Sequence, residues 1–164
     1  DPGTVPEALK SAWFAVEFGD ANLAATAIKG SLRSPKADVK AAAEALKTVV
    51  DDRMSARLAE AKQMLDEGRK WDAYVAYLSA ADEFKSYEMP GDAQAARKSL
   101  AADPAIKSAL VSKKSLDAAR KLASSDKPAA RKQALVMLEK VKADVPDSSL
   151  SREAEALIEQ IGTP

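Results

Sequence analysis

The amino-acid sequence predicts an all-α fold on the basis of its composition and of the spacing of its helix breakers. Apolar residues make up 46% of the 164-residue chain but aromatic residues only 5%, and Ala and Leu dominate the apolar fraction. Lys, Glu and Arg are also frequent, and all five of these residue types favour helix. Eight Pro and six Gly separate stretches that otherwise have helical character. We therefore expect helices joined by short turns, with strands scarce.

Proline, glycine and capping residues divide the chain into expected helices. Ser34-Pro35 and Asp103-Pro104 each combine a capping side chain with a proline suited to the first helical turn. Asp20 can cap the helix that follows the Phe18-Gly19 turn. The expected helices cover residues 5–18, 21–33, 36–50, 52–67, 71–88, 92–102, 104–124, 129–144 and 148–161. Because no Pro or Gly lies between positions 36 and 67, the third and fourth helices could instead be one long helix.

Small residues recur at a fixed distance from two turns. Gly19 precedes Ala24 by five residues, and Gly68 precedes Ala73 by the same five. In each case the glycine follows one expected helix and the alanine lies inside the next. A helix–turn–helix period with a small residue inside the second helix is typical of stacked helical hairpins, because one hairpin cannot bury its apolar face alone.

Prolines mark a longer period in the same chain. Pro35, Pro90 and Pro146 are spaced by 55 and 56 residues, and each opens an expected short, Ala-rich helix. The sequence therefore predicts a single domain over residues 1–164, built as stacked antiparallel hairpins in about three units of two to three helices. The approximate bounds of these units are 5–50, 52–102 and 104–162.

Two segments resemble tetratricopeptide (TPR) hairpins, namely "LDEGRKWDAYVAYLSAADEF" and "QALVMLEKVKADVPDSSLSREAEALIEQI". The layout of most of residues 5–161 is also similar to helical segments of extracytoplasmic bacterial proteins, some of which carry a thioredoxin-like domain. The first hairpin departs from the TPR pattern. The resemblance implies a right-handed TPR-like solenoid that binds a protein or peptide. It also favours a periplasmic location, with the cytoplasm left open.

The residue types that the chain lacks restrict its chemistry. It contains no Cys and no His, which removes thiol chemistry, disulfides, Cys/His zinc sites and His-dependent catalytic triads. Carboxylates, Lys and Tyr remain as possible catalytic groups. The longest stretch without a charge, Ala73 to Ala81, has nine residues, whereas a helix needs ~20 to span a bilayer. We expect no transmembrane segment, cofactor, metal site or enzyme activity, with a carboxylate-based enzyme as the rival class.

An acidic segment around Gly68 contains Trp71, Tyr74 and Tyr77. Aromatic residues at helical spacing are usually part of a core, so a packed joint between helices is the first interpretation. A peptide-binding groove is the second, because aromatic residues are enriched at binding hot spots. An acid/base site would need a carboxyl group with a raised pKa, and the segment contains no evident cause of such a shift.

Residues 97–142 form a basic region inside a chain of zero net charge. They include twelve Lys or Arg against four Asp or Glu. Such a run is usually a solvated helix face, and the alternative is a surface for an anionic ligand. Nucleic acid is disfavoured because this region has no aromatic residue on which bases could stack. The six residues that we call the basic group are Lys113, Lys114, Arg120, Lys121, Arg131 and Lys132.

The sequence thus predicts a non-catalytic protein-interaction or scaffolding module, expected to serve as the helical accessory domain of a larger extracytoplasmic protein. The candidate partner-binding residues are the basic group and those of Trp71, Tyr74 and Tyr77 that prove to be exposed.

Overall fold

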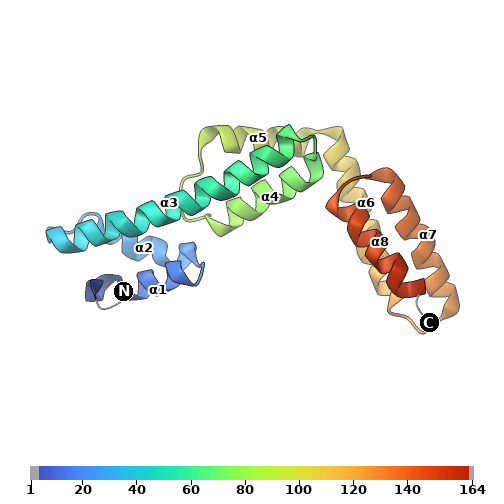
Figure 1. The fold of residues 1–164 in the computed structure, drawn as a ribbon, viewed down its shortest axis with the longest axis horizontal. Helices are drawn as coiled ribbons and strands as arrows, with labels where there is room; N and C mark the ends of the chain where they lie inside the picture. The colour runs from blue at the N-terminus through green and yellow to red at the C-terminus, as the bar shows by residue number, and fades with distance from the viewer. Residues whose placement is uncertain (1–3, 163–164) are drawn as a thin grey trace. The chain divides into compact units, whose positions relative to one another are not determined.

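A computed structural model describes residues 4–162 of the chain. Within these residues the structure contains eight α-helices and the short 3₁₀ helix η2, without any strand, which confirms the all-α prediction (Figure 1). The helix bounds are η2 (Glu7–Leu9), α1 (Lys10–Glu17), α2 (Ala21–Ser31), α3 (Ala37–Asp66), α4 (Lys70–Glu83), α5 (Gly91–Ala102), α6 (Pro104–Ala123), α7 (Pro128–Asp144) and α8 (Ser149–Gly162).

The chain folds into two compact units that are not continuous in sequence. Unit 1 comprises residues 1–62 and 76–95, and unit 2 comprises residues 63–75 and 96–164. The predicted division into three units of consecutive residues was drawn from sequence spacing alone. Its first boundary, at residues 50–52, falls inside α3.

Helix α3 is a single helix of 30 residues, so the predicted break at residues 50–52 is wrong and the single-helix alternative is confirmed. Its buried residues follow one another every three or four positions along its length, with no interruption in the pattern. They are Val39, Ala43, Leu46, Val50, Met54, Leu58 and Ala61. The acidic pair Asp51-Asp52 does not stop the helix, because its side chains lie off the buried stripe and Asp51 pairs with Lys47 on the neighbouring turn.

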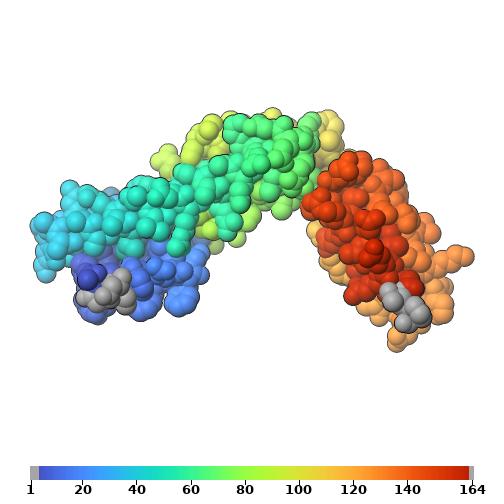
Figure 2. Space-filling model, viewed as in Figure 1, coloured from blue at the N-terminus to red at the C-terminus, as the bar shows by residue number. Residues whose placement is uncertain are grey.

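In unit 1, α1 and α2 form a hairpin whose turn is fixed by local hydrogen bonds. Gly19 adopts a left-handed conformation with φ of 83°, and the Asp20 amide donates to the Ala15 carbonyl at 2.8 Å. This pattern is a Schellman motif, which favours glycine because other residues are strained at positive φ. The Asp20 carboxylate caps α2 by accepting from the Leu23 amide at 3.0 Å, as predicted. Figure 2 shows this hairpin packed against the N-terminal part of α3.

Helix α4 ends at Glu83, five residues before the predicted end at residue 88. Asn22, at the start of α2, provides the reason. Its amide group donates to the carbonyls of Asp82 and Glu83 at 3.0 and 2.9 Å, and its side-chain oxygen accepts from the Ser86 amide at 2.9 Å. These bonds satisfy the last carbonyls of α4 and direct the chain into a turn. The first helix is also shorter than predicted, because residues 7–9 form η2 and α1 begins at Lys10.

Unit 2 contains the three packed helices α6, α7 and α8, which contact one another in all three pairs. Asp103 caps α6 by accepting from the Ala105 amide at 2.8 Å, with Pro104 in the first turn, as the sequence predicts. The buried apolar residues of these helices are Ile106, Ala109, Leu116, Ala119, Ala134, Leu138, Val141, Leu150 and Ala154. Their spacing of three, four or seven residues gives each helix one apolar face directed into the unit.

The turn at Gly68 repeats the geometry of the turn at Gly19. Gly68 has a φ of 79°, and the Arg69 amide donates to the Met64 carbonyl at 2.9 Å, which is again a Schellman motif. Ala24 and Ala73, five residues after the two glycines, are both fully buried. The two turns therefore share one local hydrogen-bond pattern, while a hairpin repeat and a solenoid built from it stay predictions.

Leucine at position 73 is expected to lower the free energy of unfolding by about 1–3 kcal/mol, because a fully buried alanine leaves no space for three further carbon atoms. Thermal or urea unfolding followed by circular dichroism measures this loss. Ala156→Leu on the exposed surface of α8 is the matched control and should change stability little. Equal stability of Ala73→Leu and the parent chain would show that the packing at this position is loose.

Candidate functional site

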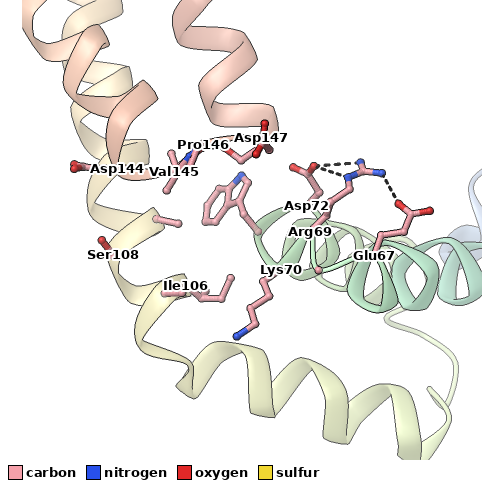
Figure 3. Close-up of a pocket in the computed structure, with 15 residues that line it drawn as sticks. Glu67, Arg69, Lys70, Asp72, Ile106, Ser108, Asp144, Val145, Pro146 and Asp147 are labelled. Atoms are coloured by element: carbon pink, nitrogen blue, oxygen red, sulfur yellow. Dashed lines mark hydrogen bonds and ion pairs between the residues drawn. The ribbon is translucent and has the colours of Figure 1, made fainter.

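A cavity of about 520 Å³ in unit 2 is lined by the start of α4, the start of α6 and the turn between α7 and α8. We call it the Trp71 cavity. Figure 3 shows Pro146 and Asp147 at one end of this cavity, and Lys70 and Ile106 at the other. Its apolar lining residues are Trp71, Ala105, Ile106, Ala109, Val145 and Pro146. The lining also includes eight charged or polar residues, namely Glu67, Arg69, Lys70, Asp72, Ser108, Asp144, Asp147 and Ser148. A concave site that combines apolar surface with polar groups is a usual form of ligand-binding site.

Asp72 is the one acidic residue that is buried among residues 4–162 of the structure, and it joins α4 to α8. One carboxylate oxygen accepts a hydrogen bond from the Ser149 amide at 2.9 Å. Asp72 thus caps the start of α8, although it lies 77 residues earlier in the chain. The other oxygen accepts from Arg69 Nε and Nη2 at 3.2 and 3.1 Å and pairs with Arg152 at 3.4 Å. Arg69 also bonds Glu67 at 3.1 Å, so it links the two carboxylates (Figure 3).

The environment of Asp72 keeps its carboxylate charged. Burial alone would raise the pKa of Asp72, but hydrogen bonds from Ser149 and Arg69 and the charge of Arg152 outweigh it, so the pKa is lowered. Hydrogen bonds from Gln63 and Arg69 likewise lower the pKa of Glu67. A general acid working near neutral pH needs a raised pKa instead. These two carboxylates are therefore suited to holding helices and side chains in place.

The structure separates the three aromatic residues of the acidic segment. Trp71 is only 9% exposed and Tyr77 only 3%, whereas Tyr74 is half-buried. The Trp71 and Tyr74 rings lie 6.1 Å apart in a tilted arrangement within unit 2, and Tyr77 belongs to unit 1. Of the three, only Trp71 lines the cavity. Burial of Trp71 and Tyr77 favours the packed-joint interpretation for these two side chains.

The basic group lies on α6 and α7, and half of its members have partners. Lys113 pairs with Asp117, and Arg120 pairs with both Asp117 and Glu153. Arg131 Nε donates to the Ser125 carbonyl at 3.1 Å. Arg120 and Arg131 also line a second pocket of unit 2, of about 490 Å³, together with apolar residues of α8. The exposed ammonium groups of Lys114 and Lys132 have no hydrogen bond or ion pair within residues 4–162, and the charge of the exposed Lys121 attracts the Asp117 carboxylate.

Sequence reasoning missed an exposed apolar surface in unit 1. Phe18 is 86% exposed and Leu23 is 73% exposed, one on each side of the Gly19 turn. The exposure of Leu23 could have been predicted from the sequence, because Leu23 lies outside the apolar stripe that α2 buries. That stripe consists of Ala21, Ala24, Ala25 and Ile28. For Phe18 the sequence shows only that it precedes a turn, where a phenyl ring can be either covered or exposed.

Among residues 4–162, no helix is both long and apolar enough to span a membrane, and no group of three or more acidic residues is arranged to hold a metal ion. Comparison of the chain with models of known protein families, with curated proteins and with solved structures found no match.

Proposed function

We propose that this protein is a non-catalytic binding module of stacked, TPR-like helical hairpins, and that it binds a peptide segment of a protein partner in the Trp71 cavity. The observation that carries the proposal is the cavity itself, a concave site of about 520 Å³ that is lined by both apolar and charged residues and whose buried carboxylate, Asp72, already has hydrogen-bond partners. Helices from three parts of unit 2 hold its walls in place. As a scaffolding segment, the module would serve as the accessory domain of a larger extracytoplasmic protein.

The state of the carboxylates supports binding over the rival carboxylate enzyme. Hydrogen bonds from Lys70 and the Ala105 amide lower the pKa of Asp103, and Lys113 lowers that of Asp117. With Asp72 and Glu67, four carboxyl groups are thus biased toward the ionised form by partners that fix their position. Paired acid and base catalysts instead have environments that separate their pKa values. Loss of a measured turnover on replacement of one of these carboxylates in a folded protein would favour the enzyme.

A peptide-display library screened against the purified chain tests the proposal. Selected peptides are expected to bind the parent chain and to lose at least about tenfold in affinity when the cavity is blocked by Ala105→Arg with Ser108→Arg. Both positions are exposed lining residues of α6, so the larger side chains fill the cavity without entering the core. Ala156→Arg, on the exposed surface of α8 and outside the lining, is the control with the same chemistry.

The basic group provides the second candidate function, binding of an anionic ligand, because Lys114, Lys121 and Lys132 are exposed and their ammonium groups form no hydrogen bond within the described chain. The two candidates differ in their dependence on salt. Binding to exposed lysines weakens steeply as salt rises, since charges are screened over ~8 Å at physiological ionic strength. Binding in the cavity should respond little. Suppose that a ligand fails to bind the variant Lys114→Glu with Lys121→Glu and still binds the cavity-blocked variant, Ala105→Arg with Ser108→Arg. That result would contradict the cavity proposal and favour binding of an anionic ligand.

A further inference from the structure

The turn between α1 and α2 presents the two most exposed large apolar side chains of residues 4–162. Phe18 is 86% exposed and Leu23 is 73% exposed, and Phe14, one turn before Phe18 on α1, is 46% exposed. Large apolar side chains that gather at one place on a surface are typical of a protein interaction site, whereas single ones are common anywhere. We call the surface formed by Phe14, Phe18 and Leu23 the turn patch.

The backbone that carries the turn patch is held in place on both sides. The Schellman bonds at Gly19 fix the end of α1, and the Asp20 carboxylate caps α2. Asn22 ties the start of α2 to the end of α4, and the Tyr87 hydroxyl donates to the Ala21 carbonyl at 3.1 Å. A partner would therefore meet a preformed surface and would not have to order it, which reduces the entropic cost of binding.

A shallow pocket of about 670 Å³ adjoins the patch and gives it an acidic edge. Phe18, Leu23, Asp20, Asp82 and Glu83 are among the residues that line it, and Lys85 is the one cationic side chain in this lining. Glu83 is paired with Arg57 at 3.4 Å. The carboxylate of Asp82 is exposed and has no hydrogen bond or ion pair within residues 4–162, and the same holds for Glu17, which precedes Phe18 in the chain and lies outside the pocket lining.

We propose that the turn patch binds a segment of a partner protein in which large apolar side chains are flanked by Lys or Arg. The apolar side chains would cover Phe18 and Leu23, and the cations would pair with Glu17 and Asp82. Charge complementarity selects this partner, because the same carboxylates repel an acidic segment, an anionic membrane surface or nucleic acid. This inference extends the proposed binding function to a second surface, which lies in unit 1, and it does not use the Trp71 cavity.

Two synthetic probe peptides test the inference by fluorescence anisotropy. In the first, labelled with fluorescein, Leu and Phe alternate with Lys; in the second, Glu replaces every Lys. The Lys probe is expected to bind and the Glu probe is not. Phe18→Ser with Leu23→Ser should weaken binding of the Lys probe at least about tenfold, since aromatic anchors dominate interface affinity. Glu17→Gln with Asp82→Asn should weaken it as well and reduce its salt dependence, because the carboxylate charges that attract the probe are removed.

The controls separate this surface from other apolar sites. Val136→Ser, which replaces a 67% exposed apolar side chain of α7 in unit 2, should leave affinity for the Lys probe unchanged. The cavity-blocked variant, Ala105→Arg with Ser108→Arg, should also keep its affinity for the Lys probe. Failure of the cavity proposal and failure of the present proposal therefore give different results. All of these positions are exposed, and unchanged thermal unfolding confirms that each variant folds.

Three results would overturn the inference. The Lys and Glu probes could bind equally well, or the Phe18 and Leu23 variant could keep its affinity for the Lys probe. The third result concerns a second copy of this chain, which also carries apolar side chains beside cations, such as the exposed Val111 near Lys114 on α6. If sedimentation shows self-association that Phe18→Ser abolishes, the occupant is this second copy and not a separate basic partner.

Discussion

Replacing Trp71 with alanine is expected to lower the free energy of unfolding by about 3–5 kcal/mol, the largest effect of any substitution considered for this chain. Trp71, on α4, is 9% exposed and lines the cavity together with the start of α6 and the turn that precedes α8. Its removal takes away a large buried apolar surface and enlarges an existing cavity, which the surrounding helices can fill only in part. Urea unfolding followed by circular dichroism measures the loss without depending on tryptophan fluorescence.

Two controls show whether the loss comes from packing. Trp71→Phe keeps an aromatic ring and should lose much less stability than Trp71→Ala. Tyr74→Ala removes the neighbouring half-buried ring, 6.1 Å away, and should also lose less. If Trp71→Ala loses under about 1 kcal/mol while the fold persists, the indole is not a packing element. It would then be a candidate anchor for a partner, as the groove interpretation of the sequence requires.

Replacing Asp72 with alanine is expected to lower the free energy of unfolding by about 2–4 kcal/mol. The change removes the acceptor of the Ser149 amide and leaves Arg69 and Arg152 without a shared carboxylate. Both arginine side chains are partly exposed to solvent. Water can therefore hydrogen-bond to them once the carboxylate is removed, which limits the loss of stability. Asp117→Ala is the matched control, because its carboxylate is 46% exposed and its ion pairs with Lys113 and Arg120 are surface pairs worth little.

The same carboxylate makes the stability of unit 2 depend on pH in the acid range. The pKa of Asp72 in the folded chain lies below its ordinary value of 3.8, so the unfolded chain takes up a proton first as pH falls. The stabilisation is therefore fully present above the ordinary value and declines as pH falls through it toward the folded pKa. Unfolding curves measured at stepwise lower pH should show a steeper loss for the parent chain than for Asp72→Asn. Parallel losses would contradict the assignment.

Features that depend on neighbouring residues were predictable from sequence. The caps at Asp20 and Asp103 and the glycine turn before each of α2 and α4 involve residues at most five apart, so sequence spacing contains the information. The sequence permits a continuous α3 but does not require it, because the absence of Pro and Gly allows a long helix without enforcing one. Packing of one apolar stripe along its whole length decides the outcome.

Features that depend on distant residues were not predictable in the same way. The end of α4 at Glu83 is set by Asn22, some sixty residues earlier, and the burial of Asp72 is made possible by Ser149 and Arg152. The candidate sites show the same limit. For Trp71 the sequence favours a packed joint over a groove only through the general rule for aromatic residues at helical spacing, and for Phe18 it indicates only a turn. Which aromatic ring is covered depends on helices that are brought together by the fold.

The hydrogen bond between Asp72 and Ser149 also bears on how unit 2 folds. It closes a loop of 77 residues, whereas α6, α7 and α8 follow one another in the chain and can pair through shorter loops. Contacts that close short loops tend to form early in folding, and those that close long loops tend to form late. A contact absent from the transition state changes the unfolding rate and leaves the refolding rate nearly unaltered. We therefore expect Asp72 to affect the unfolding rate of unit 2 more than its refolding rate.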